Sequence, residues 1–160
     1  MGRLGTFELP KNLLVVYYSG TGKTGEMASS IARGAEKEGV NVVLKSVADC
    51  TFNDLDLADG VVVGSPTYYC NMAWPIKRFL DETILAFYGE GHSLGGKVCG
   101  CFTSVGGYDD GKECLRMMEL AFGFALKMKM VPGIVLETKD VAGDLSLCFE
   151  YGRKIVQELN

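Results

Sequence analysis

A run of hydroxyls and glycines near the start of the chain carries the clearest chemistry. Ser19-Gly20-Thr21-Gly22-Lys23-Thr24 follows an apolar run and opens a helical pattern. Free backbone N–H groups at a helix start, together with the helix dipole, form a site for anions. Hydroxyls interleaved with glycines around one turn suit a terminal phosphate, whereas a helix cap uses only one hydroxyl. We therefore expect a monophosphate site over this segment.

Two other phosphate motifs overlap the same residues. A nucleoside-triphosphate loop needs a glycine five positions before Gly22, and Tyr17 stands there, so we reject it. The run from Gly20 to Gly25 also matches the dinucleotide pattern G-x-G-x-x-G, which requires an acidic residue near the end of the second strand. Lys45 stands at that position instead. Because a lysine suits a 2′-phosphate, the dinucleotide interpretation is weakened but stays open.

Two more segments follow apolar runs and combine glycines with aromatic residues. The first, Gly64-Ser65-Pro66-Thr67-Tyr68-Tyr69-Cys70-Asn71-Met72, offers flat tyrosine faces for stacking. We expect Cys70 to be an ordinary thiol, since no cation in this stretch would lower its pKa. In the second, Thr103-Ser104-Val105-Gly106-Gly107-Tyr108-Asp109-Asp110-Gly111, the paired glycines permit close approach to a planar ligand.

Short β-branched runs alternate with helical patterns along the chain, which is typical of parallel strands joined by crossover helices. The expected strands are 12–18, 41–45, 59–64, 97–103 and 130–136. The expected helices are 24–38, 72–84, 111–127 and 145–159. Trp74 falls inside a helical pattern, and we expect it in the core.

Five strands in one domain of 160 residues favour the order 2-1-3-4-5, because a full dinucleotide-binding fold needs six strands. The predicted fold is therefore a flavodoxin-like doubly wound five-stranded parallel sheet in a three-layer α/β/α arrangement. In this order the winding reverses between strands one and three, so a ligand is expected beyond their carboxyl ends. The three polar segments all fall at that edge.

The composition fits a globular protein, with 48% hydrophobic and 22% charged residues. The net charge of −4 argues against a nucleic-acid surface, and no apolar run approaches the ~20 residues of a membrane span. Six cysteines without C-x-x-C spacing and one histidine, His92, predict no metal site and reduced thiols. We expect a cytoplasmic protein. Residues Met1–Thr6 match a loose N-myristoylation pattern, which short sequences also match by chance.

The phosphate segment resembles the flavodoxin pattern Thr/Ser-x-Thr-Gly-x-Thr. The segment Gly64–Met72 resembles the G-[ST]-P-T-Y/R-x-x-x-M stretch of flavodoxin-like proteins, including the NAD(P)H:quinone reductases, and Pro75–Asp81 continues the likeness. The resemblance extends over Asn12–Asn160 and implies an FMN cofactor. The residues that it implies for cofactor binding are Ser19, Gly20, Thr21, Gly22, Lys23, Thr24, Pro66, Thr67, Tyr68, Tyr69, Cys70, Asn71, Thr103, Ser104, Val105, Gly106, Gly107 and Tyr108.

The resemblance also implies a function, namely electron transfer through FMN between redox partner proteins. The cofactor carries this chemistry, so no catalytic side chain is expected. Asp109, Asp110 and Glu113 would supply a small acidic docking patch. The alternative is an FMN-containing reductase that oxidises NAD(P)H and reduces a quinone or free flavin. A phosphoacceptor domain of the same topology needs an aspartate where Gly64 and Ser65 stand, so we exclude it. The oligomeric state stays open.

Overall fold

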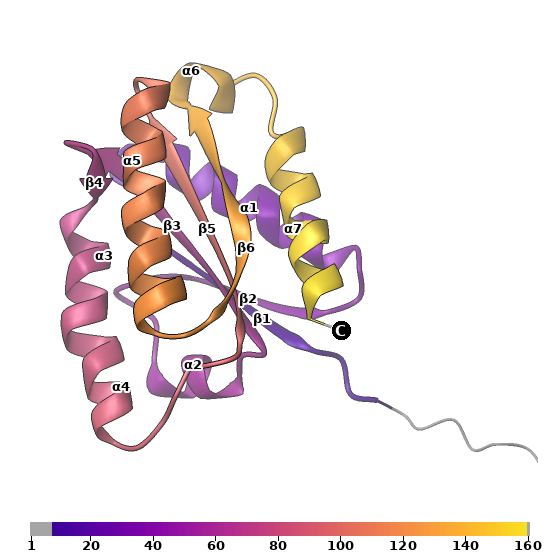
Figure 1. Cartoon of the computed structure of the whole chain (residues 1–160). Helices are drawn as coiled ribbons and strands as arrows, with labels where there is room; N and C mark the ends of the chain where they lie inside the picture. The colour runs from indigo at the N-terminus through magenta and orange to yellow at the C-terminus, as the bar shows by residue number, and fades with distance from the viewer. Residues whose placement is uncertain (1–7, 160) are drawn as a thin grey trace, which may run out of the picture.

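The centre of the protein is a mostly parallel β-sheet, seen in a computed structural model that describes residues 8–159. Five parallel strands lie in the order β2-β1-β3-β5-β6, and a short β4 pairs antiparallel with β3 (Figure 1). This confirms the predicted order 2-1-3-4-5 and adds one strand. The strands are β1 (Asn12–Tyr17), β2 (Asn41–Ser46), β3 (Gly60–Tyr68), β4 (Asn71–Met72), β5 (Val98–Val105) and β6 (Lys129–Glu137).

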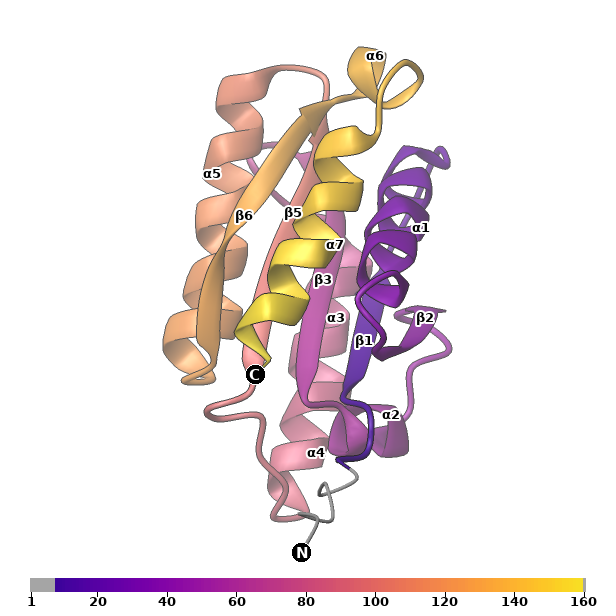
Figure 2. The ribbon, with the colours of Figure 1, turned by 90° about the vertical axis from the view of Figure 1, so that its right-hand side faces the viewer.

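Helices cover both faces of the sheet, which gives the predicted three layers (Figures 1 and 2). One face carries α1 (Lys23–Glu36), α6 (Thr138–Val141) and α7 (Ser146–Glu158). The other face carries α2 (Phe52–Leu57), α3 (Trp74–Arg78), the π-helical turn η1 (Phe79–Ile84), α4 (Leu85–Gly89), α5 (Tyr108–Glu119) and the π-helical turn η2 (Leu120–Ala125).

Strand β1 illustrates why the apolar runs form the centre of the sheet. Leu13 and Val15 point into the core beneath α1 and α7, while Leu14 and Val16 point into the core beneath α3 and α5. All four side chains are buried. A strand covered on both faces needs an apolar residue at every position, so its sequence is continuous rather than alternating.

Two strands end two or more residues later than predicted. Strand β3 continues past Gly64 to Tyr68, and β5 continues past Thr103 to Val105. The two strands pair with each other as far as Pro66 and Ser104. Residues that the sequence assigned to loops are therefore the ends of paired strands, and the third predicted loop shrinks to Gly106 and Gly107.

The prediction of one helix over 72–84 was wrong at both ends. Met72 belongs to β4, because Tyr69 and Cys70 adopt positive φ values of 52° and 61° and turn the chain into a hairpin. The helix begins at Trp74, with Pro75 in its first turn, and runs through η1 to Gly89. Trp74 is 67% exposed, so its predicted core position was also wrong. A side chain at the first helical position lies ahead of the stretch that packs on the sheet.

The sequence prediction omitted α2 and α6 and began α5 three residues late. Helix α2 nevertheless has a local signal, since the Thr51 side chain accepts from the Asp54 amide and the Asp54 side chain accepts from the Thr51 amide. The N-myristoylation pattern over Met1–Thr6 lies outside the described residues.

Candidate functional site

The three polar segments meet at the carboxyl edge of the sheet, where the winding reverses. The amide of Tyr18, just after β1, donates to the carbonyl of Gly64 in β3 at 3.1 Å. Strand β3 pairs in turn with β5. The segments after β1, β3 and β5 are therefore neighbours, as the predicted topology requires.

The first segment forms a loop that opens α1. Gly22 is the N-cap residue with φ of 93°, and as a glycine it has no side chain that could cap the helix. The Gly25 amide donates to Ser19 Oγ at 3.1 Å. The described hydrogen bonds include none donated by the amides of Lys23 and Thr24. This helix start therefore keeps donors free for an anion.

The side chain of Thr24 lies inside the protein rather than on the loop surface. It is 1% exposed, and its Oγ1 lies 2.8 Å from Ser104 Oγ in β5. Thr21, by contrast, is exposed on the loop. The structure therefore places the Thr24 hydroxyl where it joins α1 to β5.

The second segment is the β3–β4 hairpin. Its tip places Tyr69 in full contact with solvent and leaves Tyr68 45% exposed. A Cβ atom built on Gly20 would lie 2.5 Å from Tyr68 Oη, so the Tyr68 ring reaches the first loop. Pro66 is buried, Thr67 is half-buried and Asn71 is exposed.

Cys70 sits at the hairpin tip beside α5. Its Sγ donates to Asp110 Oδ1 at 3.5 Å. Partial desolvation, together with the hydrogen bond to the Asp110 carboxylate, raises the pKa of the Cys70 thiol. The thiol is thus kept protonated near neutral pH, which opposes nucleophilic reactivity.

The third segment divides into a buried and an open part. Thr103, Ser104 and Val105 are buried at the end of β5, and Thr103 Oγ1 lies 2.8 Å from Thr67 Oγ1 in β3. Gly106 and Gly107 are exposed, and a Cβ atom at either would meet no atom within 4 Å. Tyr108 begins α5 and is 51% exposed. The glycines and Tyr108 can face a ligand, whereas the three strand residues position them.

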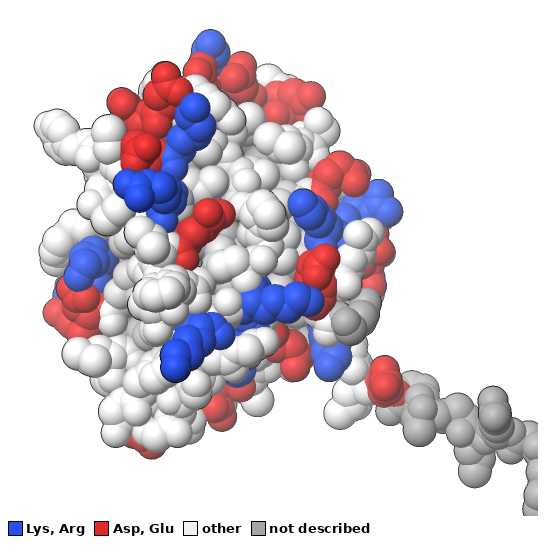
Figure 3. Space-filling model, in the orientation of Figure 1, with Lys and Arg blue, Asp and Glu red and all other residues white. Residues whose placement is uncertain are grey.

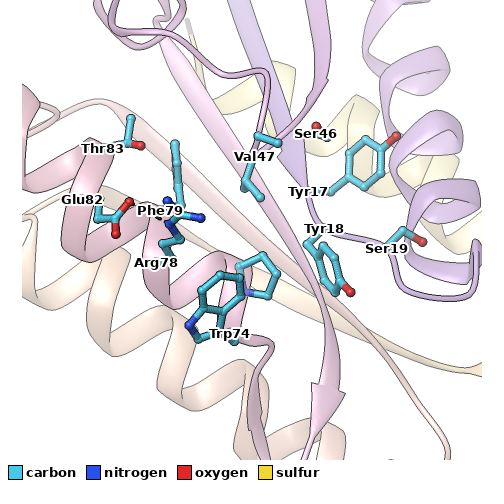
Figure 4. A pocket seen from close by; sticks show the side chains of 12 residues that line it. Tyr17, Tyr18, Ser19, Ser46, Val47, Trp74, Arg78, Phe79, Glu82 and Thr83 are labelled. Atoms are coloured by element: carbon cyan, nitrogen blue, oxygen red, sulfur yellow. Dashed lines mark hydrogen bonds and ion pairs between the residues drawn. The ribbon is translucent and has the colours of Figure 1, made fainter.

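A cavity of about 690 Å³ opens beside the first loop, between the end of β1, the β2–α2 connection and the helix from Trp74 (Figure 4). Ser19 lines it, and no other residue of the predicted set does. Sequence reasoning missed Tyr18 and Trp74, which supply aromatic walls. The apolar repeat of this helix begins at Ile76 and does not include position 74. This pattern could have predicted that Trp74 is exposed.

Lys45 does not stand free for a 2′-phosphate. Its Nζ donates to both carboxylate oxygens of Asp54, at 2.9 and 2.8 Å. This hydrogen bond raises the pKa of Lys45 despite the opposing effect of desolvation. The dinucleotide interpretation loses the one residue that had kept it open.

Residues 8–159 contain no group of three or more His, Cys, Asp or Glu side chains that could hold a metal ion. His92 stacks on Phe87 with ring centres 4.8 Å apart, and its Nδ1 lies 3.0 Å from Asp56 Oδ1. All six cysteines are free thiols, and Cys99, Cys101, Cys114 and Cys148 are buried, as expected of small core residues. In the same range, no helix is both long and apolar enough to span a bilayer.

Known proteins resemble this chain in both sequence and structure. A flavodoxin from Aquifex aeolicus is 38% identical over 115 residues, which cover 70% of this chain and 60% of that protein. NAD(P)H dehydrogenase (quinone) 3 from Rhizobium meliloti is 35% identical over 121 residues, covering 63% of this chain and 56% of that protein. The chain thus matches less than two thirds of the length of these two relatives.

A solved flavodoxin from the domain Archaea superposes with a TM-score of 0.78 at 29% identity. The superposition covers 92% of this chain and 98% of that one. The family model described as Flavodoxin matches residues 15–123, which contain all three polar segments. The chain therefore belongs to the flavodoxin family.

Proposed function

We propose that this protein binds FMN and transfers electrons between redox partner proteins. Membership of the flavodoxin family implies a flavin cofactor. The observation that carries the proposal is the convergence of an uncapped helix start, an aromatic hairpin and a glycine pair at one edge of the sheet. The first suits a phosphate, and the other two suit a flat ring.

The first loop would hold the phosphate. The amides of Lys23 and Thr24 point out of the α1 start, where the helix dipole favours negative charge. Ser19 and Thr21 add hydroxyls, and the Lys23 ammonium, 3.6 Å from Glu26, adds a cation. A Cβ atom at Gly22 would meet nothing within 4 Å, so the backbone is open to a ligand on that side.

The second and third segments would hold the ring. Tyr68 and Tyr108 offer exposed aromatic faces, and the backbone at Gly106–Gly107 offers close approach. Pro66, Thr67, Asn71 and the buried Thr103–Val105 strand end fix these elements. FMN supplies the redox chemistry when it is bound, while the chain binds it, orients it and shields one side from water.

The partner-facing edge carries a modest excess of acid. Acidic side chains gather at the end of the molecule where α5 begins (Figure 3). Asp109 pairs with Lys112 at 2.9 Å and Glu113 with Arg116 at 3.1 Å, and Asp110 accepts from Cys70. Because two of the three acids are paired with basic residues, electrostatic steering of a partner should be weak and should decrease with salt concentration.

We also propose that the protein is cytoplasmic, since free thiols at all six cysteines fit a reducing compartment.

The decisive experiment identifies the flavin that the protein binds. Purified or reconstituted protein should be yellow and should release FMN on denaturation, because the first loop is shaped for a terminal monophosphate. Chromatography of the released cofactor tests this. Release of FAD, or failure of the protein to take up any flavin, would contradict the proposal.

The relatives named NAD(P)H dehydrogenase (quinone) favour a second candidate, an FMN-containing NAD(P)H-dependent reductase. Hydride transfer needs the nicotinamide in contact with a flavin face. If Tyr68 and Tyr108 cover both faces, reduction by NADPH alone should be slow and reduction by a protein donor fast. Stopped-flow flavin bleaching separates the candidates, because rapid saturable bleaching by NAD(P)H with quinone turnover would establish the reductase.

A further inference from the structure

The helix that runs from Trp74 to Gly89 exposes one ordered row of side chains. We call this row the α3 face. It extends over α3, η1 and the start of α4, which form one continuous helical segment. Its members are Trp74, Lys77, Arg78, Asp81, Glu82 and Leu85.

Both ends of the α3 face are apolar and open to solvent. Trp74 is 67% exposed and Leu85 is 68% exposed. Between them, the four charged side chains are each 54–63% exposed. Large apolar side chains at both ends of a charged row leave apolar surface that packing within this chain does not cover.

The residue types along the row are arranged symmetrically about its midpoint, so that each basic residue has an acidic counterpart and each apolar residue an apolar one. Trp74 and Leu85 lie equally far from the midpoint between Phe79 and Leu80, as do Lys77 and Glu82, and Arg78 and Asp81. A two-fold axis through that midpoint would run two copies of the helix antiparallel. It would place each basic residue against an acidic one and each Trp74 against a Leu85. This is the self-complementarity that an isologous interface requires.

We propose that the α3 face pairs with the same face of a second copy of this chain. Charge complementarity selects this occupant, because a second copy sets an acidic side chain opposite each basic one in register, in addition to the ion pairs within each chain. In Figure 3 a basic patch lies directly above an acidic patch on the left of the molecule, over α3 and the helical turn that follows it.

The charged side chains are already ordered within one chain. Lys77 Nζ lies 2.5 Å from Asp81 Oδ2, and Arg78 Nε lies 2.7 Å from Glu82 Oε2. The Arg78 guanidinium also lies 5.4 Å from the centre of the Trp74 ring. Pairing would join these ion pairs of the two helices into one network. It would also cover the apolar side chains at both ends of the face. Less conformational entropy is lost because the side chains are held beforehand.

The pairing would also reshape the neighbourhood of the candidate site. Trp74, Arg78 and Glu82 line the cavity beside Ser19, so the partner helix would cover its mouth. The hairpin that carries Tyr68 and Tyr69 leads directly into Trp74, which places the partner's Leu85 end beside it. A single helix pair is a small interface, so we expect a reversible, concentration-dependent dimer.

Charge reversal on the intact chain tests the proposal. Lys77→Glu with Arg78→Glu makes the face wholly acidic, and Asp81→Lys with Glu82→Lys makes it wholly basic. Each double variant should dimerise at least about tenfold more weakly than the parent in analytical ultracentrifugation, because like charges then meet across the axis. A mixture of the two should form a heterodimer. The fourfold exchange, which restores complementarity in one chain, should recover the homodimer.

Two controls make the result specific. Lys112→Glu with Arg116→Glu applies the same charge change to exposed residues of α5 and should leave dimerisation unaltered. Far-ultraviolet circular dichroism and uptake of FMN are measured for every variant, so that loss of folding or of the proposed cofactor site is told apart from loss of pairing. Trp74, the single tryptophan of the chain, gives an independent fluorescence signal that should shift with protein concentration.

The proposal fails on either of two outcomes. One is a parent chain that stays monomeric at every accessible concentration, which would leave the α3 face a solvated helix surface with internal ion pairs. The other is a dimer that both double variants retain and whose mixture shows no preference for the heterodimer. A dimer of that kind would use a different surface.

Discussion

At the scale of single residues, two hydroxyl pairs hold the three candidate loops together. Thr24 Oγ1 meets Ser104 Oγ at 2.8 Å, across 80 residues of sequence, and Thr67 Oγ1 meets Thr103 Oγ1 at the same distance. A hydroxyl has one proton. If Thr24 donates to a phosphate, it must accept from Ser104, so the pair would set the direction of both bonds.

Thr24→Val tests the structural part of this arrangement. Valine keeps the shape of threonine but leaves the buried Ser104 hydroxyl without its partner. We expect the free energy of unfolding to fall by about 1–3 kcal/mol in denaturant titration. Adding Ser104→Ala should then cost little more, and additive effects of the two changes would show that the hydroxyls are not coupled.

The same variant decides whether Thr24 also serves the phosphate. A hydrogen bond to a charged group is worth about 1.5–3 kcal/mol. Thr24→Val should therefore reduce the binding free energy of FMN by that amount more than the binding free energy of riboflavin, as measured by flavin fluorescence titration. Equal weakening of both ligands would assign Thr24 to the anchoring of α1 alone.

At the scale of elements, helices α1 and α7 approach each other through glycines. A Cβ atom at Gly152 would lie 2.0 Å from the Ile31 carbonyl oxygen, and one at Gly34 would lie 1.9 Å from that of Phe149. Backbone atoms cannot move aside as flexible side-chain ends can. These two positions therefore set the distance between the helices.

Gly152→Ala should destabilise the protein in spite of a gain in helix propensity. Forcing α1 and α7 apart costs about 1–3 kcal/mol, which outweighs the roughly 1 kcal/mol that alanine contributes in a helix. Gly89→Ala is the matched control, because its Cβ would meet no atom within 4 Å. Thermal unfolding should show a loss for the first variant and no loss for the second.

Helix α2 depends on one carboxylate for its start. Hydrogen bonds from Lys45 and from Thr51 lower the pKa of Asp54, although desolvation opposes them. A lowered pKa means that this stability is present above the unfolded pKa of about 3.9 and is lost as the pH falls through the folded value.

Asp54→Asn should therefore lower the free energy of unfolding at neutral pH by about 1 kcal/mol, the value of a typical helix cap. The difference from the parent should shrink as the pH falls towards 3, because the parent then loses the charged form as well. Denaturant titrations at several pH values measure this. A difference that stays constant with pH would show that the charge of Asp54 does not contribute.

At the scale of the whole molecule, cofactor and fold should stabilise each other. The three loops converge only in the folded chain, so FMN would bind the native state alone. At a hundredfold excess over its Kd, the gain is about 2.7 kcal/mol. For a domain of this size each kcal/mol raises the Tm by roughly 2–4 °C. Thermal scans at increasing FMN should show this rise, and a Tm indifferent to FMN would contradict binding to the native state.

The sequence alone determined the features that depend on local pattern. The continuous apolar run of β1 predicts a strand that is buried on both faces. The glycine and hydroxyl pattern after it predicts a helix start with free amide donors. The alternation of such runs with amphipathic stretches set the strand order. Each of these signals lies within a few consecutive residues, where backbone geometry and burial act directly.

Only the tertiary structure decided what distant segments do to each other. The Thr24 hydroxyl turned inward because Ser104 stands at the end of β5 to meet it. Strand β3 extended to Pro66 because β5 offered partners there, and on to Tyr68 because β4 pairs with it. Trp74 was left exposed because its helix starts beyond the packed face. The two-fold pattern of the α3 face was readable in the sequence, but its meaning required knowing that all six side chains face solvent. Contacts of this kind join residues far apart in the chain, so no local pattern encodes them.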